Sequence, residues 1–125
     1  MKVCVTSTGP SLDSEIDPLF GRCQYLLFVN SESFELETVE NPNFVVTEGA
    51  GIQSAQLVAN KGAQVVITGQ IGPKAFPVLQ MAGVKVLVEG SGKVRAAVEK
   101  YKRGEFVSFA QGPTVQRYDE IAWED

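Results

Sequence analysis

Residues 65–75 read VVITGQIGPKA, an apolar β-branched run that ends in a glycine turn and then opens a predicted helix. A continuous Val/Ile run of this kind is typical of a buried strand in a parallel sheet. Pro73 suits the first position of a helix, where its fixed φ and missing N–H cost nothing. The stretch therefore predicts a strand, a turn and a helix in succession, with the amino end of the helix directed at the turn.

The turn in this stretch is a candidate binding site. Unpaired N–H groups at a helix amino end attract anions, and Gly69 and Gly72 carry no Cβ that would keep a ligand away from the backbone. Lys74 adds a positive charge beside the turn. The alternative is an ordinary loop, because glycine turns are common in α/β proteins. The spacing matches neither GxxxxGK[ST] nor GxGxxG, so neither nucleotide-binding fingerprint is present.

The rest of the chain divides into two parts with different patterns. The first part predicts three strands, at residues 2–7, 23–30 and 35–41, that form an antiparallel meander. The second part alternates helices at residues 51–60, 73–82 and 93–103 with strands at residues 64–68 and 84–88. Right-handed crossovers then predict an α/β fold with a mixed five-stranded sheet in the order 3-2-1-4-5, strands 1, 4 and 5 parallel, and helices on both faces.

This arrangement predicts one domain over residues 1–104, followed by a C-terminal tail at residues 105–125. The tail has no clean hydrophobic period, and we expect it to be partly mobile. Tyr118 and Trp123 lie in the tail and are candidates for docking on the domain or on a partner.

Composition narrows the classes of function. The chain has 125 residues, 44% hydrophobic and 21% charged, which is typical of a single soluble domain. No apolar run approaches the ~20 residues of a membrane span, and the first residues enter a strand pattern without a signal-peptide layout, so we expect a cytoplasmic protein. The net charge is −4 with dispersed basic residues, so neither nucleic acid nor membrane is an expected partner. No disulfide is expected between Cys4 and Cys23.

The chain contains no histidine, which excludes Ser-His-Asp and Cys-His nucleophile systems and every His-ligated metal site. We therefore identify no catalytic residues and expect a binding protein rather than an enzyme. The acidic loop with Asp13, Glu15 and Asp17 is interpreted as a solvated turn, with a hard-cation site as the weaker alternative. The first strand carries no carboxylate, which excludes two-metal nuclease chemistry.

The carboxyl ends of strands 1 and 4 meet at one edge of the predicted sheet, where ligands of open α/β sheets bind. The loops at this edge are residues 7–22, 69–74 and 89–93. Cys23 is expected to begin the second strand, beside the carboxyl end of the first. Its thiolate is a candidate ligand for a soft metal, and a packed thiol is the alternative.

Three segments, residues 13–23, 48–51 and 68–75, together resemble the dinitrogenase iron-molybdenum cofactor biosynthesis family, which includes NifX-like and NafY-like cofactor-binding domains. The resemblance extends over residues 1–104. It implies a ribonuclease-H-like three-layer fold and a role in binding or carrying an iron-sulfur or iron-molybdenum cofactor or its precursor. Leu19 and Glu48 stand where family members often have histidines.

The resemblance implies a site with residues from all three segments: Ser7, Arg22, Cys23, Gly49, Ala50, Gly51, Gly69, Gly72 and Lys74. It makes Cys23 the candidate metal ligand, Arg22 a cation for an anionic cluster, and the backbone amides at residues 49–51 and 69–73 anion donors. A protein partner in cofactor delivery is also expected. Two alternatives stay open: an enzyme or binder for a small anionic metabolite in the same pocket, and a family member that binds only a protein partner.

Overall fold

The structure is a computed structural model that describes residues 1–45, 49–106 and 108–114. The strands are β1 (Lys2–Ser7), β2 (Tyr25–Asn30), β3 (Leu36–Glu40), β4 (Val65–Thr68) and β5 (Lys85–Val88). The helices are α1 (Ala50–Asn60), α2 (Ala75–Met81) and α3 (Val94–Lys102), with a 3-10 helix, η1 (Pro42–Val45), before α1.

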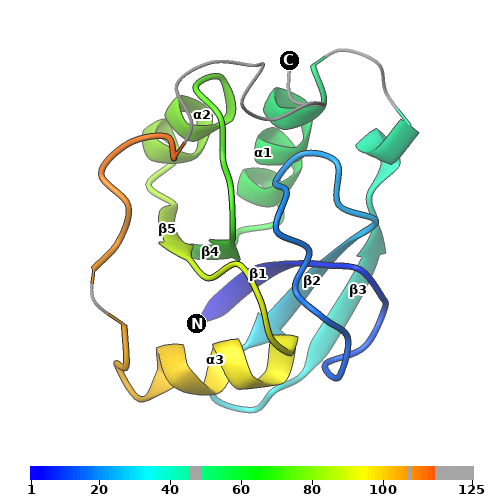
Figure 1. The fold of residues 1–125 in the computed structure, drawn as a ribbon, viewed down its shortest axis with the longest axis vertical. Coiled ribbons are helices and arrows are strands. Elements are labelled where there is room, and N and C mark those ends of the chain that lie inside the picture. The colour runs from blue at the N-terminus through cyan, green and yellow to red at the C-terminus, as the bar shows by residue number, and fades with distance from the viewer. Residues whose placement is uncertain (46–48, 107, 115–125) are drawn as a thin grey trace.

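The sheet has the order β3-β2-β1-β4-β5, which confirms the predicted topology. β1 pairs antiparallel with β2 and parallel with β4, and β4 pairs parallel with β5. Three layers result, with α1 and α2 on one face of the sheet and α3 on the other (Figure 1). The carboxyl ends of the three parallel strands therefore share one edge, as expected.

The strand sequences explain this layering. Side chains alternate between the two faces of a strand, so Cys4 packs toward α1 and α2 while Val3 and Val5 pack toward α3. All four residues of β4 are buried, as a central strand covered on both faces requires. β3 lies at the edge and is mostly exposed.

Two predicted boundaries were wrong by two residues each. β2 begins at Tyr25 rather than Cys23, because the side-chain amide of Asn41 takes the Cys23 carbonyl oxygen at 3.0 Å. α2 begins at Ala75 rather than Pro73, although the Phe76 N–H already donates to the Gly72 carbonyl at 3.2 Å. Pro73 therefore lies within a helix-like turn, although the assigned helix begins two residues later.

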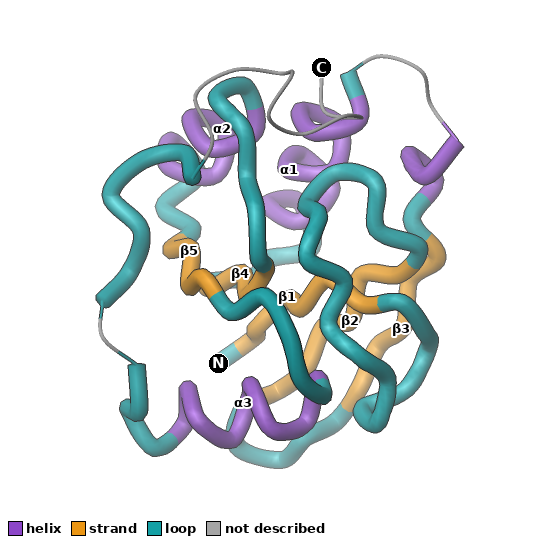
Figure 2. The backbone as a smooth tube through the Cα atoms, viewed as in Figure 1, coloured by secondary structure: helices purple, strands orange, loops and turns teal. Residues whose placement is uncertain are grey.

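The long segment between β1 and β2 is tied to the domain at several points. Isolated β-bridges join Ser7 to Ile16, Glu15 to Lys93, and Leu19 to Gln70. Figure 2 shows this loop folded over the edge of the sheet. Phe20, from the same loop, is only 1% exposed and belongs to the core beneath α1 and α2.

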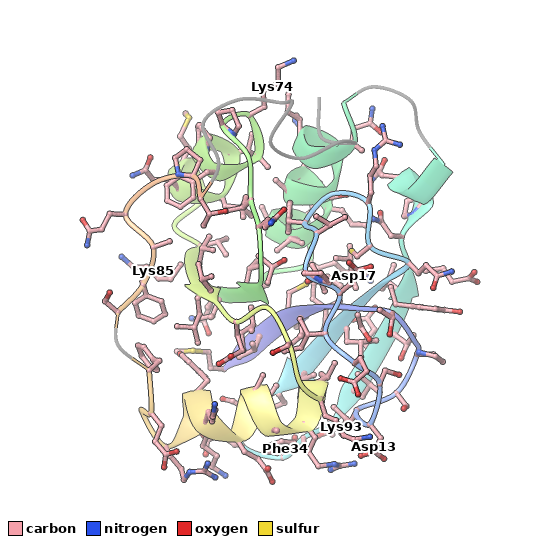
Figure 3. All side chains as sticks on the ribbon, in the orientation of Figure 1. Asp13, Asp17, Phe34, Lys74, Lys85 and Lys93 are labelled. Carbon is pink, nitrogen blue, oxygen red and sulfur yellow. The ribbon has the colours of Figure 1, made fainter. Side chains whose placement is uncertain are left out.

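The acidic part of this loop lies at the start of α3. The Arg95 Nε donates to the Asp13 carboxylate at 3.2 Å, and the Lys93 Nζ donates to the Asp13 carbonyl at 3.2 Å (Figure 3). Among the described residues, no group of three or more His, Cys, Asp or Glu side chains could hold a metal ion. Asp13 therefore serves a contact between the loop and α3.

The described part of the tail, residues 105–106 and 108–114, returns to the sheet. The Ala110 N–H donates to the Val86 carbonyl at 2.8 Å, so residues 108–111 pass beside β5. Tyr118 and Trp123 lie outside the described residues. Within the part of the chain that is described, none of the helices has the length and apolar character to cross a bilayer.

Replacing Phe20 with Ala should lower the free energy of unfolding by about 3–5 kcal/mol, because a fully buried ring would be lost from the core. The matched control is Met81→Ala at the end of α2, where the side chain is 89% exposed and the change should stay within about 0.5 kcal/mol. Urea denaturation of both variants measures the difference. A Phe20→Ala variant as stable as the parent would contradict the placement of this loop in the core.

Candidate functional site

The three segments singled out in the sequence meet at the carboxyl edge of β1 and β4. Their contact is made by backbone atoms at two places, where Pro18 lies against Gly69 and Gly21 lies against Gly51. We call these two contacts the glycine junction. The junction joins the β1–β2 loop to the β4–α2 turn and to the first turn of α1.

Gly69 is needed at the first contact. A Cβ on this residue would lie 2.8 Å from the Pro18 carbonyl oxygen and 2.9 Å from its Cα, closer than a side chain can approach backbone. Two hydrogen bonds hold the segments together, from the Gln70 N–H to the Pro18 carbonyl at 2.6 Å and from the Phe20 N–H to the Gln70 carbonyl at 3.0 Å. The close neighbour of Gly69 is thus the chain's own backbone.

Gly21 is needed at the second contact. Its φ of 105° is a conformation that side chains rarely adopt. A Cβ here would also lie 3.0 Å from the Cα of Gly51 and 3.2 Å from its nitrogen. Arg22 follows directly and is half-buried, so the junction places its backbone next to the amino end of α1.

A buried polar network supports the loop behind the junction. The Asn41 amide donates to the carbonyls of Gly21 and Cys23 at 3.1 and 3.0 Å, and the Ser54 hydroxyl donates to the Gly21 carbonyl at 3.0 Å. The Asn43 amide donates to Ser54 at 3.3 Å. This network was not predicted from the sequence, since Asn41 was placed only at the end of a strand and no role was assigned to Asn43 or Ser54.

Polar side chains also end the two central parallel strands. Thr6 and Thr68 are fully buried, and their hydroxyl oxygens lie 2.9 Å apart. Thr6 also donates to the Asp17 carbonyl at 2.6 Å. Burial raises the pKa of the Asp17 carboxyl, against the lowering effect of backbone hydrogen bonds from Leu19 and Gln24. Thr6 and Thr68 were not predicted as site residues, although they lie at or next to the carboxyl ends of two apolar strands, and Asp17 was interpreted as part of a solvated turn.

Ser7, a predicted site residue, is buried at the end of β1. Its hydroxyl donates to the Gly9 carbonyl at 2.7 Å and accepts from the Gly9 N–H at 3.2 Å. Both contacts stay within the first turn of the loop. In this structure the Ser7 side chain therefore shapes the loop.

Cys23 is fully buried, and both cysteines are free thiols. Burial raises the pKa of Cys23 to about 12, and the negative charge of nearby Asp17 acts in the same direction, while the Asn41 amide, 3.7 Å from the sulfur, partly opposes them. Burial raises the pKa of Cys4 as well. At neutral pH both side chains are protonated thiols, which are poor nucleophiles and poor metal ligands.

The helix starts contribute positive charge at this edge. α1 has Gly49 as its N-cap and no side-chain cap, and both Ala50 and Gly51 are buried. Arg22 lies next to this helix end through the glycine junction. Lys74 is exposed at the start of α2, where its side chain points away from the domain (Figure 3). α2 has only seven residues, so its own dipole adds little.

Four surface pockets lined by described residues have volumes of about 260 to 460 Å³. One lies at the start of β3 and the other three lie around α3, β5 and the segment after α3. None of these four contains a predicted site residue. The glycine junction is therefore a place where segments converge, and these pockets lie elsewhere.

Comparison with known proteins gives consistent matches. The family model described as dinitrogenase iron-molybdenum cofactor matches residues 1–104. The apo form of the orange protein from Desulfovibrio gigas is 40% identical, with a TM-score of 0.86 over 91% of this chain and 96% of that one. The NMR structure of a Thermotoga protein provisionally named NifB is 30% identical, with a TM-score of 0.73 over 89% and 98%. An uncharacterized protein of Methanocaldococcus jannaschii is 30% identical over 80% of this chain and 87% of its own length.

Replacing Gly69 with Ala should destabilise the fold by about 1–3 kcal/mol, because the added methyl group overlaps the Pro18 backbone. Gly90→Ala is the matched control, since a Cβ there meets only the Gly69 Cα at 3.8 Å. Thermal and urea unfolding measure both variants. Equal stability of the two would show that the junction is looser than described.

The buried Cys23 thiol predicts a pH dependence of stability. Its folded pKa of about 12 lies above the unfolded value of about 8.5, so the folded state holds the proton more tightly. The stabilisation is complete below the unfolded pKa and is lost as the pH rises from about 9 toward 12, by up to ~1.4 kcal/mol per pH unit. Cys23→Ala should show a shallower loss than the parent by urea denaturation, whereas parallel curves would contradict the raised pKa.

Proposed function

Because the chain belongs to the dinitrogenase iron-molybdenum cofactor family, we propose that it binds and carries an anionic metal–sulfur cofactor or precursor, of the iron-molybdenum or iron-sulfur type. The observation that carries the proposal is the family match, which spans the three segments that meet at the glycine junction. The 40% identity to a protein described in an apo form adds support, since an apo form implies a ligand-bearing one.

The residues of the chain do not fit a cluster held by several side-chain ligands. Such clusters need multiple thiolates or imidazoles. The chain has no histidine, and the described residues contain no group of three candidate ligands. The fully buried Cys23 would have to leave the core and lose a proton whose pKa is about 12. We therefore treat the metal–sulfur group as cargo that is held by charge and hydrogen bonds.

In this proposal the cargo lies at the carboxyl edge of β1 and β4. Arg22 supplies the charge of its guanidinium, and residues 49–51 supply the positive end of the α1 dipole. Lys74, at the start of α2, adds positive charge at the periphery of this edge, with its side chain directed away from the domain. Ser7, Gly69 and Gly72 shape the loops that carry these groups. The assignment of Cys23 as a metal ligand stays a prediction from the sequence, and its burial favours a packing role.

A carrier must release its cargo to a recipient, so a protein partner in delivery is part of the proposal. Release is compatible with contacts of this kind, because charge-based contacts exchange faster than metal–thiolate bonds are broken. Native mass spectrometry of the purified protein discriminates the alternative ligand class. A bound sugar phosphate or carboxylate would favour a metabolite binder, and bound iron or molybdenum with sulfide would favour the carrier.

Anaerobic equilibrium dialysis of the full chain against tetrathiomolybdate, an anionic molybdenum–sulfur probe, tests the proposal. The parent should bind, and Arg22→Gln should bind about tenfold more weakly, because one charged hydrogen bond is lost. Lys85→Gln, which removes one positive charge at the start of β5, should bind like the parent (Figure 3).

Cys23→Ala is informative in the same assay. A side chain that makes no bond to the ligand should change the affinity by no more than about twofold. An effect of this size would show that Cys23 packs in the core and does not bind the ligand. Loss of binding by a variant that still folds would show that Cys23 is a ligand of the metal. If the parent binds neither tetrathiomolybdate nor iron with sulfide, the carrier function is refuted.

A further inference from the structure

The segment at residues 108–114, which we call the strap, runs along the β5 edge of the sheet and ends on the candidate turn. Figure 1 shows it in orange, running from the α3 side of the molecule toward the start of α2. The Ala110 N–H joins it to β5 through the Val86 carbonyl, at 2.8 Å. Its last described residue, Thr114, contacts Ile71.

Thr114 engages both backbone polar groups of Ile71. The Ile71 N–H donates to the Thr114 hydroxyl oxygen at 2.8 Å, and the Thr114 N–H donates to the Ile71 carbonyl at 2.9 Å. Ile71 is the middle residue of the Gln70–Gly72 turn. Its amide is therefore one of the donors that the sequence assigned to an anionic ligand.

The neighbouring residue of the turn has a different kind of partner. The N–H and carbonyl of Gln70 bond to Pro18 and Phe20, which belong to the glycine junction and to the core of the domain. The partner of Ile71 comes from the tail, beyond the residues that the family model matches. Of these two amides, only that of Ile71 can lose its hydrogen-bond partner without breaking the glycine junction.

The strap follows a pair of packed aromatic rings at one end, and its last described residue is exposed. The rings of Phe106 and Phe109 lie 5.0 Å apart and pack on the α3 side of the sheet. A surface pocket of about 460 Å³ is lined by residues 108–111 together with residues of α2 and β5, and Thr114 itself is exposed. Segments with few buried contacts and exposed hydrogen bonds open at low free energy.

We propose that the strap is an autoinhibitory latch on the candidate site. The Thr114 hydroxyl accepts from the Ile71 N–H in this structure, and an anionic ligand takes that donor when the strap lifts, with the Phe106–Phe109 anchor as its fixed end. The inference rests on the proposed function, because it assumes that the turn receives an anion.

Binding of tetrathiomolybdate to full-length Thr114→Val and Thr114→Ser, beside the parent, tests the latch. Valine keeps the branched shape but removes the oxygen that accepts from Ile71, so affinity should rise roughly three- to tenfold, the effect of one net hydrogen bond. Serine retains the hydroxyl and should restore the parent affinity. Thermal unfolding of both variants shows that the fold is intact.

Amide hydrogen exchange supplies a second readout. Without ligand, the Ile71 amide should exchange faster in Thr114→Val than in the parent. Adding the probe to the parent should speed exchange at Ala110 and Thr114, because the strap lifts. If the probe binds while these two amides stay equally protected, or if Thr114→Val binds no more tightly than the parent, the latch is wrong.

The outcomes separate the latch from the proposed function. If the parent binds the probe and Thr114→Val binds it no more tightly, the latch is refuted and the carrier function stands. Binding by Thr114→Val but not by the parent supports both ideas, as a latch that is closed under the assay conditions. If neither protein binds the probe, both the carrier function and the latch are refuted.

Discussion

The contact on which the rest of the structure depends is the close approach of backbones at Pro18–Gly69 and Gly21–Gly51. It is available only because Gly69 and Gly21 have no side chain and because Gly21 adopts a positive φ. Through it, a long polar loop becomes part of the domain. Phe20 enters the core, and the carboxyl edge of the sheet is closed by the protein's own loops.

Burial at this junction also determines the electrostatics of the site. Cys23 lies behind the loop, where it stays a neutral thiol, and Asp17 is partly desolvated beside it. Two cations, Arg22 and Lys74, belong to the loops that meet here, together with the amino end of α1 at Gly49. This distribution suits an anion held without metal–thiolate bonds, which agrees with a chain that lacks histidine but belongs to a cofactor family.

Much of the fold could be predicted because its signals are local. The apolar run at residues 65–68 and the helix stops at Gly62, Gly83 and Gly104 are visible in short windows, and the handedness of crossovers then orders the strands. The starts of β2 and α2 were misplaced, since a side-chain hydrogen bond from Asn41 ends the ladder before Cys23. The Asn41–Ser54 network was missed because its partners are distant in the sequence and its residue types are common in loops.

The sequence by itself determined the fold class, the sheet order, the family and the absence of histidine chemistry, because periodicity, composition and motif spacing need no neighbour in space. Only the tertiary structure decided that Gly69 accommodates Pro18, that Cys23 is sealed in the core and that the tail bonds the Ile71 amide. Each of these depends on burial or on a hydrogen-bond partner from another part of the chain. Such partners are specified only once the chain has folded.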